Sequence, residues 1–263
     1  MGPTQTKTTT SIAVEKLNGD IAKFPMIFPV TEDMHITHKG VNRLVMIDRY
    51  AQKDMEKVTL AVGDFVVLTT KEDPKFPARG LGFVQAMDKI NNTATILVEE
   101  EYRTPLEGME AETGIVVRSL DIVEKPLEVY WEQIAKRNAF GLASVEPTEE
   151  LKTKWFQAFY QELMQSHFIP AGRVLYGAGS GSDVTFFNCY VMPMPRDSRE
   201  GLAEHRKEVM EIMSRGGGVG TNGSTLRPRH ALARGVNGKS SGSVSWLDDI
   251  AKLTHLVSQG GSR

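Results

Sequence analysis

Cysteine is the scarcest reactive residue in this sequence, with one among 263 residues. A single cysteine excludes an internal disulfide and any cysteine cluster around a metal. The six histidines are scattered without the spacing of metal ligands, so no metal site is expected. Long apolar runs are lacking too, and the N-terminus has neither the charged nor the apolar region of a signal peptide. We therefore expect a cytoplasmic protein with no membrane partner.

An excess of charge of either sign is also absent. Lys and Arg number 31 against 33 Asp and Glu, and the net charge of -2 gives no reason to expect nucleic acid as a partner. Hydrophobic residues make up 40% and charged residues 24% of the chain, which indicates an ordinary globular protein rather than a disordered one. The length allows two domains.

The first half of the sequence has the pattern of a small β-rich module over residues 30–125, after a loose tail over residues 1–29. Apolar runs bounded by turn residues predict strands. These runs cover residues 43–50, 60–68, 81–87, 93–99 and 114–123. Asp88 to Asn92 has the turn chemistry of a β-hairpin, because Asn tolerates the left-handed conformation. Four or five short strands predict a small barrel or a curled sheet.

Residues 126–168 have the pattern of a helical segment. Thr148, followed by two acids, predicts a helix start. An i, i+4 stripe behind it predicts a buried face. This stripe consists of Leu151, Trp155, Phe159 and Leu163. The last segment, residues 169–263, holds most of the glycines and predicts two more helices, one over residues 200–213 and one that starts at Ser245.

Three stretches of this last segment have residues suited to chemistry. In the first, Pro170 to Val191, small residues allow close approach to a ligand and Arg173 is able to meet a phosphate. Cys189 in the same stretch is either a redox thiol or a small buried hydrophobe, and a lone cysteine is more often the latter.

The other two stretches suggest binding of an anion. Ser214 to Arg227 is a glycine run with Arg and Asn interleaved, which offers exposed amides to a phosphate or simply forms a flexible loop. It matches neither a Walker A loop nor a dinucleotide fingerprint. Arg227 to Arg234 places three arginines before a Ser/Gly loop, which indicates phosphate binding or a solvated face.

Taken together and in this order, short motifs of residues 125–263 resemble ribonucleotide reductase large chains. The motifs are Pro-Ala-Gly-Arg, Asn-Cys-Tyr-Val, Arg-Gly-Gly-Gly-Val-Gly-Thr-Asn, Leu-Arg-Pro-Arg, Lys-Ser-Ser-Gly-Ser-Val-Ser and Gln-Gly-Gly-Ser-Arg. Residues 35–125 resemble the N-terminal region of some adenosylcobalamin-dependent members. The resemblance implies a mixed α+β / α/β fold, in which residues 169–263 form the opening part of a ten-stranded α/β barrel.

The resemblance also implies roles for single residues. In the family a transient thiyl radical removes the ribose 3′ hydrogen, and a cysteine pair supplies two electrons and becomes a disulfide. Cys189 matches one member of that pair, which favours its redox interpretation. Arg173, Asn188 and Gly218 match positions that line the substrate pocket.

A second group of residues matches the family's site for an allosteric deoxynucleotide, which lies at a dimer interface and selects the ribonucleotide to be reduced. Asp197 and Ser198 match the segment that holds the deoxyribose, and Arg227 and Arg234 match the arginines that grip the phosphates. A guanidinium suits a pair of phosphate oxygens, and a carboxylate accepts from a sugar hydroxyl.

The resemblance leaves the chain incomplete as a catalyst. It ends at Gln259 to Arg263, within a motif that the family continues, and nothing in it matches the later Asn-x-Cys-x-Glu segment. We expect it to need the C-terminal reductase portion, which would supply most of the contacts to adenosylcobalamin. The other expected partners are a ribonucleotide substrate, a deoxynucleotide effector and a thioredoxin-like reductant. A homodimer is expected for the complete enzyme, and self-association for this chain alone.

Two other functions stay open from the sequence. One keeps the family but takes the radical from a separate metal-containing subunit. The other is a non-catalytic, regulatory protein that retains only the nucleotide site.

Overall fold

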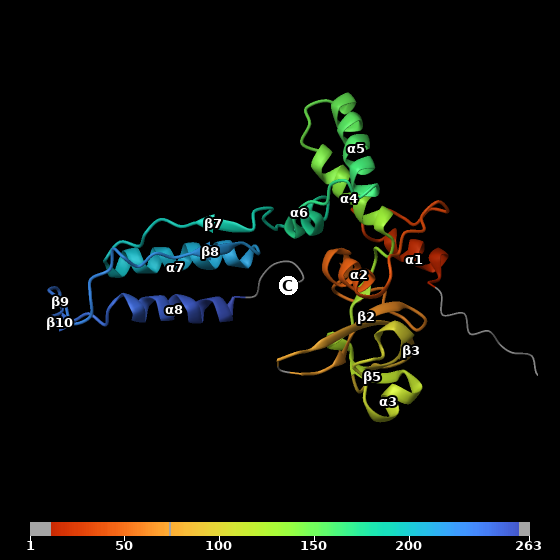
Figure 1. Ribbon diagram of the computed structural model, residues 1–263, viewed down its shortest axis with the longest axis horizontal. Helices are drawn as coiled ribbons and strands as arrows, with labels where there is room; N and C mark the ends of the chain where they lie inside the picture. The colour runs from red at the N-terminus through yellow and green to blue at the C-terminus, as the bar shows by residue number, and fades with distance from the viewer. Residues whose placement is uncertain (1–11, 74, 258–263) are drawn as a thin grey trace, which may run out of the picture. The chain divides into compact units, whose positions relative to one another are not determined.

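The computed structural model describes residues 12–73 and 75–257 of the chain. It consists of two compact units, Met1–Ile169 and Pro170–Arg263 (Figure 1). The first eleven residues of the predicted tail and the terminal motif Gln259 to Arg263 lie outside the described residues.

The first unit combines a curled sheet with surrounding helices. Its strands are β1 (Lys53–Asp54), β2 (Phe65–Lys71), β3 (Ala78–Asp88), β4 (Thr93–Val98), β5 (Ile115–Ser119) and β6 (Lys125–Pro126). Its helices are α1 (Val14–Ile21), α2 (Gly40–Val45), α3 (Gly108–Thr113), α4 (Trp131–Ala143) and α5 (Glu149–Met164), with the π-helix η1 (Met46–Tyr50) and the 3-10 helices η2 (Glu100–Tyr102) and η3 (Leu120–Ile122).

The curled sheet has the strand order β2-β3-β4-β5, antiparallel throughout. Its inner face is the core of the module, because the apolar residues of successive strands are fully buried there. They include Val66, Leu68, Val84, Ile96, Val98 and Val116. The sheet curls back on itself where the backbone of Glu124 pairs with that of Val67 on β2. The predicted β-rich module, its β3–β4 hairpin and the mixed α and β fold are thus confirmed.

An arginine completes the closure between the two outer strands. The Arg118 guanidinium on β5 donates to the backbone carbonyls of Thr69 and Thr70 on β2, each at 2.9 Å. Glu110 holds the same guanidinium from α3 with two hydrogen bonds of 2.8 and 2.9 Å. The Arg118 side chain therefore links β5 to β2 by hydrogen bonds, although the backbones of these two strands do not form a ladder.

Two predictions for this unit are wrong. Residues 43–50, predicted as a strand, continue α2 into η1 and bury Met46 and Ile47. A short apolar run does not distinguish a strand from a buried helix by its periodicity. The predicted loose tail contains α1, which buries Leu17 and Ile21 and is fixed by two hydrogen bonds between the Asn18 side chain and the Val30 backbone.

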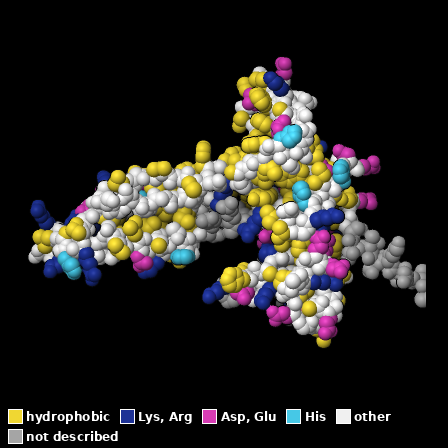
Figure 2. Space-filling view, in the orientation of Figure 1, with side chains coloured by type: hydrophobic (Ala, Val, Ile, Leu, Met, Phe, Trp, Pro, Cys, Tyr) yellow, Lys and Arg dark blue, Asp and Glu magenta, His cyan; other side chains and the backbone are white. Residues whose placement is uncertain are grey.

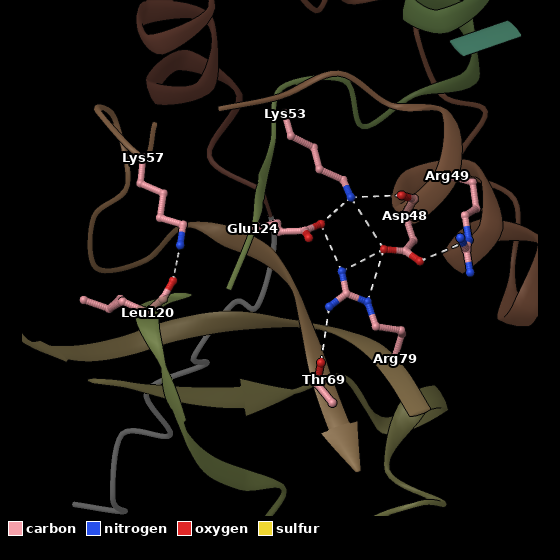
Figure 3. Close-up of polar contacts among 8 residues, drawn as sticks. All are labelled: Asp48, Arg49, Lys53, Lys57, Thr69, Arg79, Leu120 and Glu124. Atoms are coloured by element: carbon pink, nitrogen blue, oxygen red, sulfur yellow. Dashed lines mark hydrogen bonds and ion pairs between the residues drawn. The ribbon is translucent and has the colours of Figure 1, made fainter. Parts of the chain in front are cut away.

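A network of charges fastens η1 to the sheet (Figure 3). Arg79 on β3 donates to Asp48 of η1 at 2.9 Å and to Glu124 at 2.9 Å. Lys53 lies on the other side of the same two carboxylates and contacts both. Although burial alone would raise the pKa of Asp48, the charges and hydrogen bonds of Arg79 and then Lys53 outweigh it and hold that pKa below its ordinary value.

In the helical segment α4 packs against α5, and α4 also carries one member of a buried ion pair. Arg137 of α4 and Glu128 are both fully buried, and their Nε–Oε1 distance is 2.7 Å. Thr148 caps α5 as predicted, since its hydroxyl accepts from the Leu151 amide. Of the predicted buried stripe only Leu163 is buried, and Trp155 is 37% exposed. That part of the stripe prediction is wrong, because α5 is covered along one narrow side rather than along its whole aromatic face.

The second unit places two long helices side by side. Its elements are α6 (Gly172–Gly177), β7 (Cys189–Val191), α7 (Arg199–Ser214), β8 (Gly218–Gly220), β9 (Leu232–Ala233), β10 (Gly238–Lys239) and α8 (Ser243–Leu256). Val209 and Met213 of α7 pack with Leu253 of α8 in one core cluster. The helix predicted over residues 200–213 is confirmed by α7. The last helix starts at Ser243 rather than Ser245, with Gly242 as its N-cap.

Candidate functional site

The lone cysteine lies on a short parallel strand pair. Residues of β7 and β8 pair in register, so that Cys189 is opposite Gly218. The Gly218 amide donates to the Asn188 carbonyl at 2.7 Å. Cys189 is exposed and free, which contradicts the interpretation of a buried hydrophobe. Three predicted residues, Cys189, Gly218 and Asn188, are therefore brought together.

Glycine at the strand pair keeps the space beside the thiol open. A Cβ on Gly218 would lie 3.7 Å from the Cys189 Sγ and 3.2 Å from the Asn188 carbonyl oxygen. A Cβ on the preceding Gly217 would lie 2.6 Å from Ile212 and 2.8 Å from the Tyr190 ring, which is too close for any other residue. Gly218–Gly220 of the glycine run thus form a strand, and Gly217 before it is closely packed.

Arg173 is placed differently from the other predicted substrate residues. It lies on α6 and is buried, with 7% of its surface exposed. Its guanidinium is therefore not presented to solvent as a phosphate-binding group would be, and its substrate role stays a prediction.

The four residues predicted for the effector line one pocket of the second unit. Its volume is about 760 Å³, within the range of small-molecule sites. Asp197 and Ser198 enter it from the start of α7, while Arg227 and Arg234 come from the loop that leads into β9 and from the β9–β10 turn. Residues as far apart as Asp197 and Arg234 in the sequence therefore share one cavity.

The pocket has cationic and apolar walls. Its basic side chains are Arg199, Arg227, Arg234 and Lys239. Its larger apolar side chains are Leu202, Leu232, Val236 and Trp246. Figure 2 shows Lys and Arg side chains gathered over the end of the unit that carries β9 and β10. A ligand with a multiply charged anionic part and a flat apolar part fits both walls.

The starts of both long helices also face this pocket. Ser198 caps α7, and its hydroxyl accepts from the Gly201 amide at 3.0 Å. Ser240 and Ser241 lead into α8 and line the same pocket. Gly242 makes this entry possible, because it adopts a φ of 94° and a Cβ there would lie 3.0 Å from the Arg229 side chain. Helix starts carry partial positive charge, which adds to the cationic wall.

Within the pocket, Asp197 and Arg227 are bound to each other. Arg227 donates through Nε to the Asp197 carboxylate at 2.7 Å and through one terminal nitrogen to its carbonyl at 3.2 Å. A third bond of 3.3 Å joins Arg227 to the Leu232 carbonyl. Arg227 is thus oriented before any ligand enters, whereas Arg234 is exposed at the rim.

Sequence reasoning missed part of the pocket lining. Arg199, Lys239 and Trp246 were given no role, yet all three line the cavity. Lys239 had a visible signal, because it stands in the Lys-Ser-Ser-Gly motif. Trp246 had none, since an aromatic residue in the first turn of an amphipathic helix has the same pattern as a core residue.

Other kinds of site are not seen in the described residues. Within residues 12–73 and 75–257, no three His, Cys, Asp or Glu side chains group as metal ligands do. No helix in this part of the chain is both long enough and apolar enough to cross a membrane.

Two family models match the chain from residue 121 onward. The model described as ribonucleotide reductase, all-alpha domain, matches residues 121–183. The one described as ribonucleotide reductase, barrel domain, matches residues 187–263, which contain both Cys189 and the cationic pocket. The chain belongs to the ribonucleotide reductase large-subunit family. The β-rich module precedes most of the matched range.

Curated relatives agree with this membership. The chain is 31% identical over 166 residues to a vitamin B12-dependent ribonucleoside-diphosphate reductase of Thermoplasma acidophilum, an alignment covering 57% of this chain and 21% of the relative. It is 27% identical over 142 residues to a ribonucleoside-diphosphate reductase large subunit of Plasmodium falciparum, covering 54% and 16%. The match to the Caenorhabditis elegans large subunit is 24% over 178 residues, covering 67% and 21%. The alignments thus cover only 16% to 21% of the length of these relatives.

Proposed function

We propose that this chain is the N-terminal part of a ribonucleotide reductase catalytic subunit, which converts ribonucleotides to deoxyribonucleotides. The observation that carries the proposal is the strand pair of the barrel-domain match, where the exposed Cys189 lies opposite Gly218. The reaction removes the ribose 2′ hydroxyl as water and takes two electrons and two protons from two thiols, which become a disulfide.

In this proposal Cys189 supplies one of the two thiols. Because the chain has one cysteine, the second thiol belongs to the C-terminal reductase portion. Asn188 and Gly218 border the ribose, with Gly218 leaving room for it beside the sulfur. A thioredoxin-like dithiol then reduces the disulfide and restores both thiols.

The cationic pocket is proposed to bind the deoxynucleotide effector. Four basic side chains and two helix starts suit a triphosphate. In this proposal the Asp197 carboxylate, which also lines the pocket, accepts from the sugar hydroxyl. The resemblance places this site at a homodimer interface, and we extend that arrangement to the complete enzyme.

Adenosylcobalamin is the radical source that we propose, on the strength of the vitamin B12-dependent relative. The residues described here do not fit that cofactor, since the cationic pocket has the charge and the volume of a site for a nucleotide. No step is therefore assigned to it in this chain. A separate metal-radical subunit is the second candidate, because the other relatives are named simply as large subunits.

A reconstitution tests the proposal. This chain is mixed with the C-terminal reductase portion, a dithiol, a ribonucleotide and adenosylcobalamin, and deoxyribonucleotide is measured. We expect product that is lost with Cys189→Ser and kept with Val145→Ala, an exposed position of the first unit. Product that requires a second subunit in place of adenosylcobalamin would support the second candidate. Full activity of Cys189→Ser would overturn the redox role and favour a regulatory protein.

A further inference from the structure

The effector pocket has an apolar wall that its phosphate-binding residues do not explain. Leu232 and Val236 expose 56% and 67% of their surface beside the arginines. Trp246 lines the same pocket from the first turn of α8 and is half-buried. Apolar side chains left open within a polar pocket indicate a ligand with an apolar part.

The position of Trp246 relates it to the phosphate-binding wall. Ser240 and Ser241, just before α8, line the pocket beside Lys239, and Trp246 follows one turn later. The cationic loop and the indole are therefore held by one short segment, which Gly242 bends through its positive φ. A ligand whose phosphates bind at Lys239 would extend its other end along this turn.

The chemistry of the indole selects the kind of ligand. Nucleobases stack on aromatic side chains, and such stacking tolerates any base because each has a flat π-face. Tryptophan offers the largest such face and a small loss of conformational freedom. A purely anionic ligand would gain nothing from this wall.

We propose that Trp246 is the stacking platform for the base of the nucleotide that binds in this pocket. The inference rests on the proposed effector site and adds its base-binding residue. Trp246 supplies affinity that is common to purine and pyrimidine bases, while Arg227, Arg234 and Lys239 bind the phosphates.

The test separates the base from the phosphates with two probes. The affinities of the 263-residue chain for dATP and for inorganic tripolyphosphate are measured by calorimetry. Trp246→Leu should weaken dATP binding about tenfold, in line with the loss of one base stack, and leave tripolyphosphate binding unchanged. Trp246→Phe keeps a ring and should retain most of the dATP affinity. Val244→Ala, an exposed neighbour on α8 that does not line the pocket, serves as the matched control.

Fluorescence gives a second readout. The chain has three tryptophans, and dATP should quench the emission of the unmodified chain but not that of Trp246→Phe. Tripolyphosphate should quench neither. Circular dichroism of each variant shows that its helices are retained.

The possible failures are distinct. If dATP binds and Trp246→Leu binds it equally well, the stacking role is overturned while the effector site stands. If Trp246→Leu loses affinity for both probes, or loses self-association in sedimentation together with dATP binding, Trp246 acts on the fold or on an interface and the proposal is wrong. If neither probe binds the unmodified chain, the effector site and the stacking role both fail, whereas the redox role of Cys189 is untouched.

Discussion

Arg227 donates through Nε to the Asp197 carboxylate at 2.7 Å, so the two residues proposed to bind the phosphates and the sugar are paired with each other. Their side chains are 36% and 34% exposed. An ion pair so open to solvent contributes little stability, typically about 0–1 kcal/mol. A phosphate is therefore able to compete for Arg227 at small cost.

This competition predicts the effect of removing the carboxylate. Asp197→Asn should raise the affinity for inorganic tripolyphosphate severalfold, because it removes a negative charge from the cationic wall. Calorimetry at low salt measures the change, and Arg227→Gln should lower the same affinity. Glu204→Gln, an acid of α7 that pairs with Lys207 outside the pocket, is the control. Equal affinity of Asp197→Asn and the unmodified chain would contradict a phosphate site at Arg227.

Access to the thiol depends on the glycine opposite it. Gly218→Val should slow the reaction of Cys189 with an aromatic disulfide reagent severalfold, since even a Cβ at Gly218 lies 3.7 Å from Sγ. Gly220→Val on the same strand is the matched control, because nothing lies within 4 Å of its Cβ. The rate is followed by absorbance of the released thiolate. Similar rates in both variants would show that Gly218 does not shape the space around the sulfur.

The buried pair Arg137–Glu128 predicts a large loss of stability. Arg137→Met leaves the fully buried Glu128 carboxylate without its counter-charge, although the Gln52 amide still donates to it at 2.8 Å. Breaking such a pair costs about 3–5 kcal/mol of unfolding free energy. Urea unfolding followed by circular dichroism measures it. Lys152→Met, which removes an exposed ion pair with Glu149, should change stability by less than about 0.5 kcal/mol.

Acid should weaken the attachment of η1 to the sheet. The pKa of Asp48 lies below its ordinary value in the folded protein, because Arg79 and Lys53 outweigh the effect of burial. Its contribution to stability is therefore present above the unfolded pKa of about 4 and is lost as pH falls through the lower folded pKa. The unfolding midpoint of Asp48→Asn should lie below that of the unmodified chain at neutral pH, and the difference should shrink toward about pH 3. Asp183→Asn, an exposed acid, should show no such convergence.

How far the sequence predicted this structure depended on whether the signal was local. The Thr148 cap, the β3–β4 hairpin and α7 follow from adjacent residues, and all three are confirmed. The run over residues 43–50 failed because its apolar residues fit a strand and a buried helix equally well. The outer half of the α5 stripe failed for a related reason: periodicity identifies an apolar face but not what covers it.

The residues of the candidate site were predictable where they belong to motifs whose order along the sequence matches the family. The motif resemblance selected Asp197, Ser198, Arg227 and Arg234, and the fold brings these residues to one pocket. Trp246 was beyond reach, because only the three-dimensional path of the loop before α8 turns it toward that pocket. Arg173 is the opposite case: its motif predicted a guanidinium able to meet a phosphate, whereas the fold buries the residue.

The closure of the curled sheet by Arg118 has a consequence for how the β-rich module opens. Two side-chain hydrogen bonds join β5 to β2 at that point. The two strands therefore separate there when the Arg118 guanidinium rotates, without the loss of a backbone ladder between them. Backbone amides at the edges of β2 and β5 that meet here should then exchange with deuterium through a local opening, well before the amides of the central strands β3 and β4. The module is therefore closed by a side chain rather than by a continuous backbone ladder at this point, and Glu110 stabilises the closed arrangement by holding the Arg118 guanidinium in place.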